Sequence, residues 1–183
     1  STAAVGDLCS VLEAGGPTEF VGRDRDEAEA VVVDFDGDMG VLDRTPFYAE
    51  SGGQVGDTGT ITWDGGSVEV LDTTLALDGL HCHKVTADAS GPEVGQTVTA
   101  VIDTERRAAI RRNHTGTHIL HWALRQVLGD HVKQQGSWVG PDHLRFDFSH
   151  FEALTAEQMT AVEDLANADI LANPSCNHYE TSK

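Results

Sequence analysis

Short apolar runs alternate with polar positions through the first half of the chain. Between residues 23 and 103 these runs are rich in Val, Ile and Thr and are separated by turn residues such as Asp36-Gly37 and Asp64-Gly65-Gly66. Regular spacing of short strands is typical of a small antiparallel barrel or sandwich. The strands are expected at residues 30–35, 39–42, 58–63, 67–71, 80–85 and 96–102.

After residue 103 the pattern changes to a helical period. Asp103 or Thr104 is placed to cap a first helical segment over residues 105–112, and a second is expected from about residue 115 to Leu128. Gly129 follows as a C-terminal cap. One face of the second segment is apolar, because hydrophobic residues recur at helical spacing. They are Ile119, Leu120, Ala123, Leu124, Val127 and Leu128.

A hairpin and a further helix complete the pattern. Strands are expected at 131–139 and 143–148, joined by the turn at 140–142. Thr155 with Gln158 three residues later forms a capping box, which opens a helix to about Ala172. The predicted fold is therefore α+β. It has a lead-in over residues 1–22, a small antiparallel β-barrel-like subdomain over 23–103 and a helix, hairpin and helix unit over 104–183.

Composition narrows the class of protein. The chain has 183 residues, of which 39% are hydrophobic, as in an ordinary globular protein. No window approaches the roughly 18 consecutive apolar residues of a membrane helix, and no signal peptide is visible. The three cysteines, Cys9, Cys82 and Cys176, are odd in number and widely spaced, which favours a reducing compartment over a disulfide framework. We therefore expect a cytoplasmic protein with no membrane partner.

The charge distribution changes what the net charge implies. A net charge of −18 argues against a nucleic-acid-binding surface, because phosphate contacts need Lys and Arg. Four of the 12 basic residues nevertheless fall within one seven-residue stretch. They are Arg106, Arg107, Arg111 and Arg112. This cluster is either a solvated helix face or a local basic patch on an acidic body.

His114 and His118 form an H-x-x-x-H pair on the expected helix. Residues at i and i+4 share a helical face about 5–6 Å apart, which allows two imidazoles to ligate one Zn²⁺. The residue after His114 is Thr115 rather than Glu, so the H-E-x-x-H pattern of metalloproteases is absent. A zinc site also needs a third and usually a fourth ligand, and no other histidine or cysteine completes it convincingly. Cys176 and His178 form only a C-x-H.

Two longer segments carry a family resemblance. Residues 43–59, DRTPFYAESGGQVGDTG, look like the signature segment that precedes the editing core of alanyl-tRNA synthetases. Residues 112–121, RNHTGTHILH, resemble the first metal-binding motif of the same editing domain, and residues 124–137 and 144–151 continue it in order. Gly116 departs from the pattern, because the family usually has Ala there.

The resemblance implies roles for individual residues. In that family the pair matching His114 and His118 supplies two zinc ligands, and a C-x-x-x-H pair farther along supplies the others. That second pair is absent from this chain, so the editing core is expected to be incomplete here. Thr117, Gln134 and Ser137 match positions that line the editing pocket. The arginine cluster is expected to meet phosphates near the tRNA acceptor end.

The function implied is that of an editing domain. Within an alanyl-tRNA synthetase, which ligates alanine to tRNA(Ala), such a segment would hydrolyse Ser-tRNA(Ala) and Gly-tRNA(Ala) at the tRNA 3′ end. A small pocket for alanine discriminates poorly against glycine, which has one methyl less, and serine, which has one hydroxyl more. A second, hydrolytic site is the usual remedy. Zn²⁺ is the cofactor expected here, while ATP and Mg²⁺ would belong to the absent aminoacylation domain. A free-standing trans-editing deacylase and a non-catalytic tRNA-contacting module are the alternatives.

Overall fold

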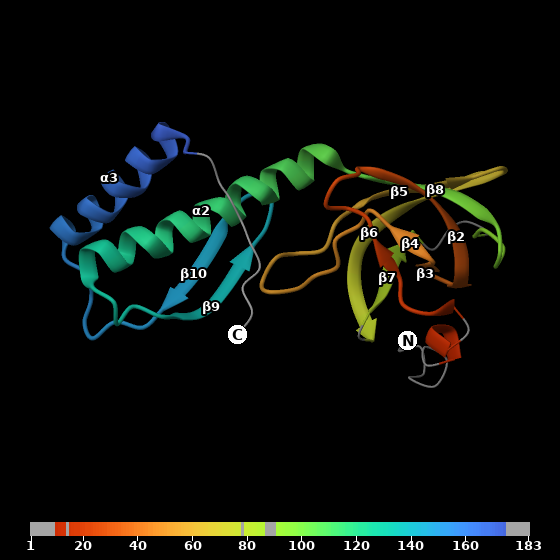
Figure 1. Cartoon of the computed structure of the whole chain (residues 1–183), viewed down its shortest axis with the longest axis horizontal. Helices are drawn as coiled ribbons and strands as arrows, with labels where there is room; N and C mark the ends of the chain where they lie inside the picture. The colour runs from red at the N-terminus through yellow and green to blue at the C-terminus, as the bar shows by residue number, and fades with distance from the viewer. Residues whose placement is uncertain (1–9, 14, 78, 87–90, 175–183) are drawn as a thin grey trace.

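The computed structural model describes residues 10–13, 15–77, 79–86 and 91–174. Six strands form a closed antiparallel barrel in the order β2-β3-β7-β6-β5-β8 (Figure 1). Their bounds are β2 Glu27–Asp36, β3 Met39–Leu42, β5 Gly59–Trp63, β6 Gly66–Leu77, β7 Leu80–Val85 and β8 Thr97–Ile102. The predicted α+β fold, a small barrel followed by helices and a hairpin, is confirmed.

Alternation of side chains explains why these strands close around a core. In β2, Ala28, Ala30 and Val32 are buried while the residues between them are exposed. Successive residues of a strand point to opposite faces, so one face of each strand fills the barrel interior. The same rule gives a shared core of small and β-branched side chains around Phe47.

The end of the expected lead-in is attached to the barrel. β1, Glu19–Phe20, pairs in parallel with β4, Arg44–Thr45. Thr18, just before β1, donates a hydrogen bond from its hydroxyl to the Leu42 carbonyl, 3.1 Å away. These contacts fix Phe20 beside the barrel strands.

One long helix leads out of the barrel. α2, Thr104–Leu128, is a single helix of 25 residues where the sequence predicted two segments. The Asp103 side chain accepts a hydrogen bond from the Arg106 backbone N–H at its start, and Gly129 caps its end. At 1.5 Å per residue the helix is about 37 Å long. It begins at the barrel and ends against α3 (Figure 1).

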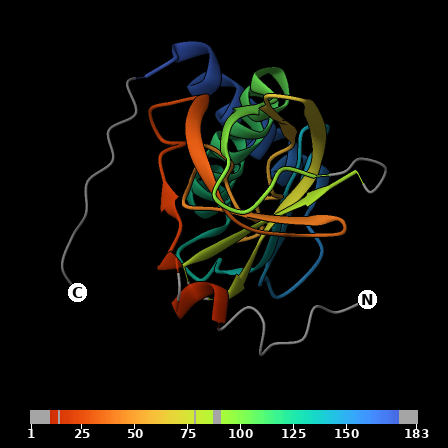
Figure 2. The same cartoon turned by 90° about the vertical axis from the view of Figure 1, so that its right-hand side faces the viewer.

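The second half packs on α2. The hairpin of β9, Gln134–Val139, and β10, Leu144–Phe148, lies along α2, and α3, Ala156–Ala172, packs on the same helix. The predicted capping box of Thr155 and Gln158 is present at the start of α3. Figure 2, which looks onto the barrel end, shows α2 and α3 behind the barrel. None of the helices in the described part of the chain is both long and apolar enough to cross a membrane.

The loop over residues 46–58 connects the two halves. It leaves the barrel after β4 and reaches the hairpin, where the Val55 N–H donates to the Val139 carbonyl at 3.1 Å. The Val139 N–H in turn donates to the Gly53 carbonyl at 2.8 Å. The loop, the start of α2 and the hairpin therefore meet in one place.

Candidate functional site

The predicted site residues meet in one small cavity. It has a volume of about 60 Å³ and lies between α2, the hairpin and the loop 46–58. Residues from all three segments line it: Gly52, His114, Thr117, His118, His121, Gln134, Ser137, Val139 and Phe146. The five side chains proposed from the sequence as pocket or metal residues are all among them.

The histidine pair has a defined orientation. The rings of His114 and His118 are stacked, with centroids 5.1 Å apart and planes 19° from parallel. His114 Nδ1 donates its proton to Gln54 Oε1 across 2.6 Å, since an amide oxygen only accepts. The Nε2 atom of His114 is then left with its lone pair. A hydrogen bond to the second nitrogen is how proteins orient metal-binding histidines.

Burial keeps His114 in the form that ligates metals. Desolvation lowers the pKa of His114, and the neighbouring His118 lowers it further. A neutral imidazole is the metal-binding species, so this environment favours ligation over protonation. Gln54 is itself buried, with 7% of its surface exposed, which holds its amide in place.

The zinc donor set is only partly present. His114 and His118 fit as two ligands of one ion by their spacing and orientation. Among the described residues, however, no group of three or more His, Cys, Asp or Glu side chains is arranged to hold a metal. Cys82 is buried in the barrel, and Cys9, Cys176 and His178 lie outside the described residues. The zinc assignment accordingly stays a prediction.

Hydroxyl and amide groups line the rest of the cavity. Thr117 is buried, and its hydroxyl donates to the Asn113 carbonyl at 2.9 Å, which leaves the oxygen lone pairs free to accept. Ser137 and Gln134 lie on β9, where Ser137 pairs with Phe146 and Gln134 with Phe148. Three polar side chains from two elements thus reach one space.

His121 adds a further polar atom to this cavity. Its ring lies 5.0 Å from that of Phe146, and its Nε2 is buried with no hydrogen-bond partner within the described part of the protein. A buried polar atom without a partner is costly and is usually satisfied by a water or a ligand. The cavity therefore has unmet capacity for hydrogen bonding.

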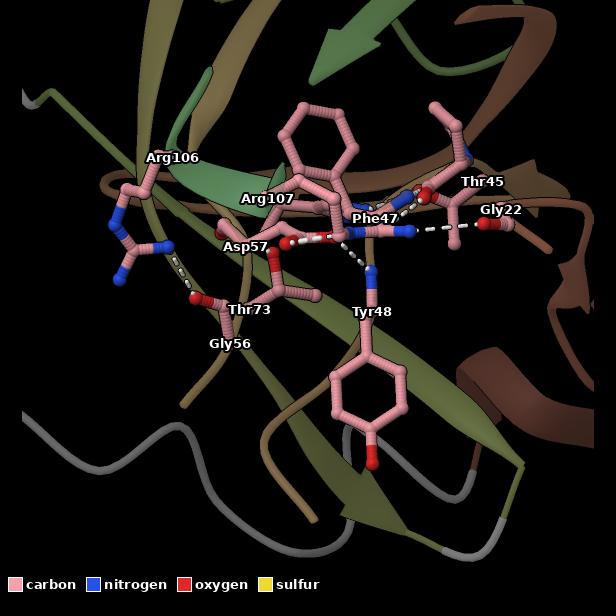
Figure 3. Close-up of polar contacts among 11 residues, drawn as sticks. Gly22, Thr45, Phe47, Tyr48, Gly56, Asp57, Thr73, Arg106 and Arg107 are labelled. Atoms are coloured by element: carbon pink, nitrogen blue, oxygen red, sulfur yellow. Dashed lines mark hydrogen bonds and ion pairs between the residues drawn. The ribbon is translucent and has the colours of Figure 1, made fainter. Parts of the chain in front are cut away.

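The arginine cluster divides into inward- and outward-facing side chains. Arg107 is buried and forms an ion pair with Asp57, donating from Nε to both carboxylate oxygens at 2.9 and 2.8 Å (Figure 3). It also donates to the Gly22 carbonyl at 2.9 Å and the Pro46 carbonyl at 3.0 Å. This arginine holds the start of α2 onto the barrel. The sequence had suggested that it contacts a tRNA phosphate, but its guanidinium group is buried in the ion pair.

The other three arginines are arranged differently. Arg106 donates to the Gly56 carbonyl at 2.8 Å, so it too supports the loop (Figure 3). Arg111 and Arg112 are exposed on α2. A phosphate-binding role for these three stays a prediction, with Arg111 and Arg112 the more accessible.

Comparisons with known proteins fit this arrangement. The family model described as "tRNA synthetases class II (A)" matches residues 18–106. An alanine–tRNA ligase from Sorangium cellulosum is 54% identical over 133 residues, which is 73% of this chain and 14% of that protein. Another from Acetivibrio thermocellus is 46% identical over 189 residues, 96% of this chain and 22% of that protein. A third, from Chromohalobacter salexigens, is 48% identical and covers 91% of the chain and 21% of that protein.

The chain belongs to the alanyl-tRNA synthetase family. It spans between 14% and 22% of the length of these three relatives. Residues 43–59, the segment that resembles the alanyl-tRNA synthetase family in sequence, contain the loop 46–58 that reaches from the barrel to the hairpin.

Sequence reasoning missed two features of this loop. Gln54, which holds His114, and Gly53, whose backbone bonds the hairpin, were not singled out as site residues. Both lie inside residues 43–59, the segment that resembles the alanyl-tRNA synthetase family, and that position was the available signal. Their partners are far away in sequence, so no local pattern reveals the contacts.

Proposed function

We propose that this segment is part of the editing site of an alanyl-tRNA synthetase and serves to hydrolyse Ser-tRNA(Ala) and Gly-tRNA(Ala). The longer protein would carry the ATP-dependent ligation of alanine to tRNA(Ala). One observation carries the proposal: His114, His118, Thr117, Gln134 and Ser137 line the same small cavity.

The size of the cavity supports selection of small amino acids. A space of about 60 Å³ is large enough to accept the side chain of serine or glycine. Family membership supports the tRNA partner, since the relatives are alanine–tRNA ligases.

Polarity supports discrimination between serine and alanine. A serine hydroxyl donates to the free lone pairs of Thr117 and accepts from the Gln134 amide. An alanine methyl of similar size would leave the buried Thr117 hydroxyl without this partner, at a cost of about 1–3 kcal/mol. Sites built to bind a hydroxyl reject analogues that lack it far better than apolar sites reject an added one.

Zinc completes the proposal. His114 and His118 would hold Zn²⁺ together with ligands from outside the described residues, and the bound ion would supply Lewis acidity toward the ester. The chain's own groups bind and orient the aminoacyl end: Gln54 fixes the ring of His114, and Thr117 sorts the side chain. Arg111 and Arg112 would attract the acceptor-strand phosphates despite the acidic body.

The test is hydrolysis of Ser-tRNA(Ala) with Zn²⁺ present, with Ala-tRNA(Ala) as the counter-substrate. It is run with this chain and with a full-length alanine–tRNA ligase that carries the same segment. Thr117→Val removes the hydroxyl at constant volume, and Thr115→Val on the exposed side of the same helical turn is the matched control. We expect Thr117→Val to reduce the serine-over-alanine ratio of kcat/KM by about tenfold, since the lost hydrogen bond is of the order of 1–2 kcal/mol.

Three outcomes separate the alternatives. Serine release by both proteins places a working site within this chain. Release by the full-length ligase alone shows that these residues are part of a larger site. Binding of tRNA without hydrolysis by either protein would overturn the proposal in favour of a non-catalytic tRNA-contacting module.

A further inference from the structure

A second, larger cavity opens beside the small one. Its volume is about 660 Å³, and it lies between the barrel and the start of α2. His114 lines both cavities, and Gln54, its hydrogen-bond partner, lines the larger one. The two spaces therefore meet at the first histidine of the pair.

Aromatic rings form one side of the large cavity. The rings of Phe20 and His81 are stacked, with centroids 5.7 Å apart and planes 6° from parallel. Tyr48 meets Phe20 edge to face at 6.1 Å. In Figure 3 the Tyr48 ring points away from the buried ion pair of Arg107. All three rings are half-buried, so each keeps exposed surface.

His81 carries an unsatisfied hydrogen-bonding atom. Its Nδ1 is buried and has no partner among the residues that the structure describes. Burial also lowers the pKa of His81, which keeps the ring neutral at pH 7. A neutral imidazole offers one donor and one acceptor, the complement of the mixed donor and acceptor edge of a nucleobase.

Three arginines line the same cavity, of which the buried Arg107 is held by Asp57 and the other two are exposed. Arg23 follows β1 and Arg111 lies on α2, and both are exposed. Neither forms an ion pair with another described residue. Asp24 is the one acidic residue among the described residues that lines the cavity with them.

We infer that this groove binds the terminal nucleotide of the tRNA acceptor strand, with its base against Phe20 and His81 and its phosphate near Arg23 and Arg111. The inference rests on the proposed editing function. Aromatic side chains that stack on bases, flanked by cations that attract the backbone, are the usual way to hold a single-stranded end. A volume of about 660 Å³ suits a nucleotide, and the histidine shared by both cavities would then face the ester bond.

The test measures binding of a short RNA and needs no catalysis. The probe is the tetranucleotide ACCA with a 5′ fluorescent label, compared with ACC, which lacks the terminal adenosine. Fluorescence anisotropy gives the Kd for each. Stacking contributes about 1–3 kcal/mol per base, so ACCA is expected to bind the chain roughly tenfold more tightly than ACC.

Paired variants locate the contact. Phe20→Leu keeps an apolar side chain but removes the stacking ring, and Arg111→Gln removes one cation from the groove. The matched controls are Phe151→Leu, an exposed aromatic after β10, and Arg145→Gln, an exposed arginine on β10 that does not line the groove. Circular dichroism of each variant checks that it is folded.

The expected result is that Phe20→Leu abolishes the preference for ACCA over ACC, while both controls leave it unchanged. Arg111→Gln should weaken both RNAs and reduce the salt dependence of binding. Equal binding of ACCA and ACC by the native chain would overturn the inference, as would equal effects of the groove variants and their controls. Hydrolysis of Ser-tRNA(Ala) with an unaltered KM in Phe20→Leu would overturn it while leaving the editing function standing.

Discussion

The buried ion pair between Arg107 and Asp57 gives the sharpest prediction of stability. The two side chains are only 7% and 2% exposed. Arg107→Leu leaves the Asp57 carboxylate with the Tyr48 N–H, 2.8 Å away, but without its counter-charge. It also leaves the carbonyls of Gly22 and Pro46 without their donor. Breaking one side of a buried pair costs about 3–5 kcal/mol, because a charge stays buried and uncompensated.

The same helix supplies a matched control. Arg125 forms an ion pair with Asp130 at 2.6 Å, but these side chains are 44% and 92% exposed. Exposed pairs contribute about 0–1 kcal/mol. Arg125→Leu therefore removes the same chemistry from α2 at small cost.

Urea unfolding followed by circular dichroism measures both changes. Arg107→Leu should lower the free energy of unfolding by about 3–5 kcal/mol and Arg125→Leu by less than about 1 kcal/mol. Adding Asp57→Asn to Arg107→Leu should restore part of the loss, since the stranded charge is removed. Equal losses for the two arginine variants, or no recovery in the double variant, would refute the reasoning.

Four further outcomes follow from single residues. Burial lowers the pKa of His83 to about 4, so between pH 6.5 and 4 the unfolded chain binds a proton that the folded chain does not. The stability that depends on this group is complete above pH 6.5 and falls by about 2–3 kcal/mol toward pH 4. Urea unfolding at several pH values should show this decrease in the native chain but not in His83→Gln. Gln54→Leu removes the acceptor that orients His114, the first of the two proposed zinc ligands. Competition with a chelating dye should then show a 10- to 100-fold weaker affinity for Zn²⁺, with Gln54→Glu close to the native protein. Gly53→Ala should destabilise the chain and slow the proposed hydrolysis of Ser-tRNA(Ala), because the added Cβ would collide with a backbone carbonyl of β9. Gly52 is also at positive φ but has open space around it, so Gly52→Ala should cost only about 1 kcal/mol of stability, measured by thermal unfolding. Gly116→Ala should raise the free energy of unfolding by up to about 1 kcal/mol, because Ala has the higher helix propensity. The added Cβ would lie 3.4 Å from a β10 side chain, which is an ordinary contact. No gain in stability would mean that α2 is strained at this position.

The barrel strands were the most predictable part of the fold. β7 begins and ends where the alternation of its side chains predicted, at Leu80 and Val85. β6 was predicted to end at residue 71 but continues to Leu77. Polar residues at 72–74 interrupt the local pattern, and only pairing with β7 keeps them in the strand.

The middle of α2 was underestimated for a related reason. Asn113 and Gly116 have low helix propensity, so the sequence indicated a break there. The Asn113 side chain donates to the Gly140 carbonyl at 2.8 Å and the Pro141 carbonyl at 3.2 Å, contacts made across the hairpin turn. Tertiary contacts of this kind keep the helix continuous.

The candidate site was predictable where it followed a motif. The histidine pair was predicted from its H-x-x-x-H spacing, and Thr117, Gln134 and Ser137 were predicted from the family resemblance. The structure brings all five together. The inward turn of Arg107 was not predictable, because its partner Asp57 is 50 residues away in sequence. The local sequence of an arginine cluster does not show which of its side chains face solvent and which face the protein interior.

The small cavity is lined by residues that come before and after residue 103 in the sequence. This limits where two related sequences could be recombined. A recombination event at that position would separate Gln54 from His114 and Asp57 from Arg107. In a hybrid of two distant relatives joined there, the residues of each half would face residues of the other relative at these contacts. We therefore expect the positions paired across residue 103 to change together or stay fixed among relatives.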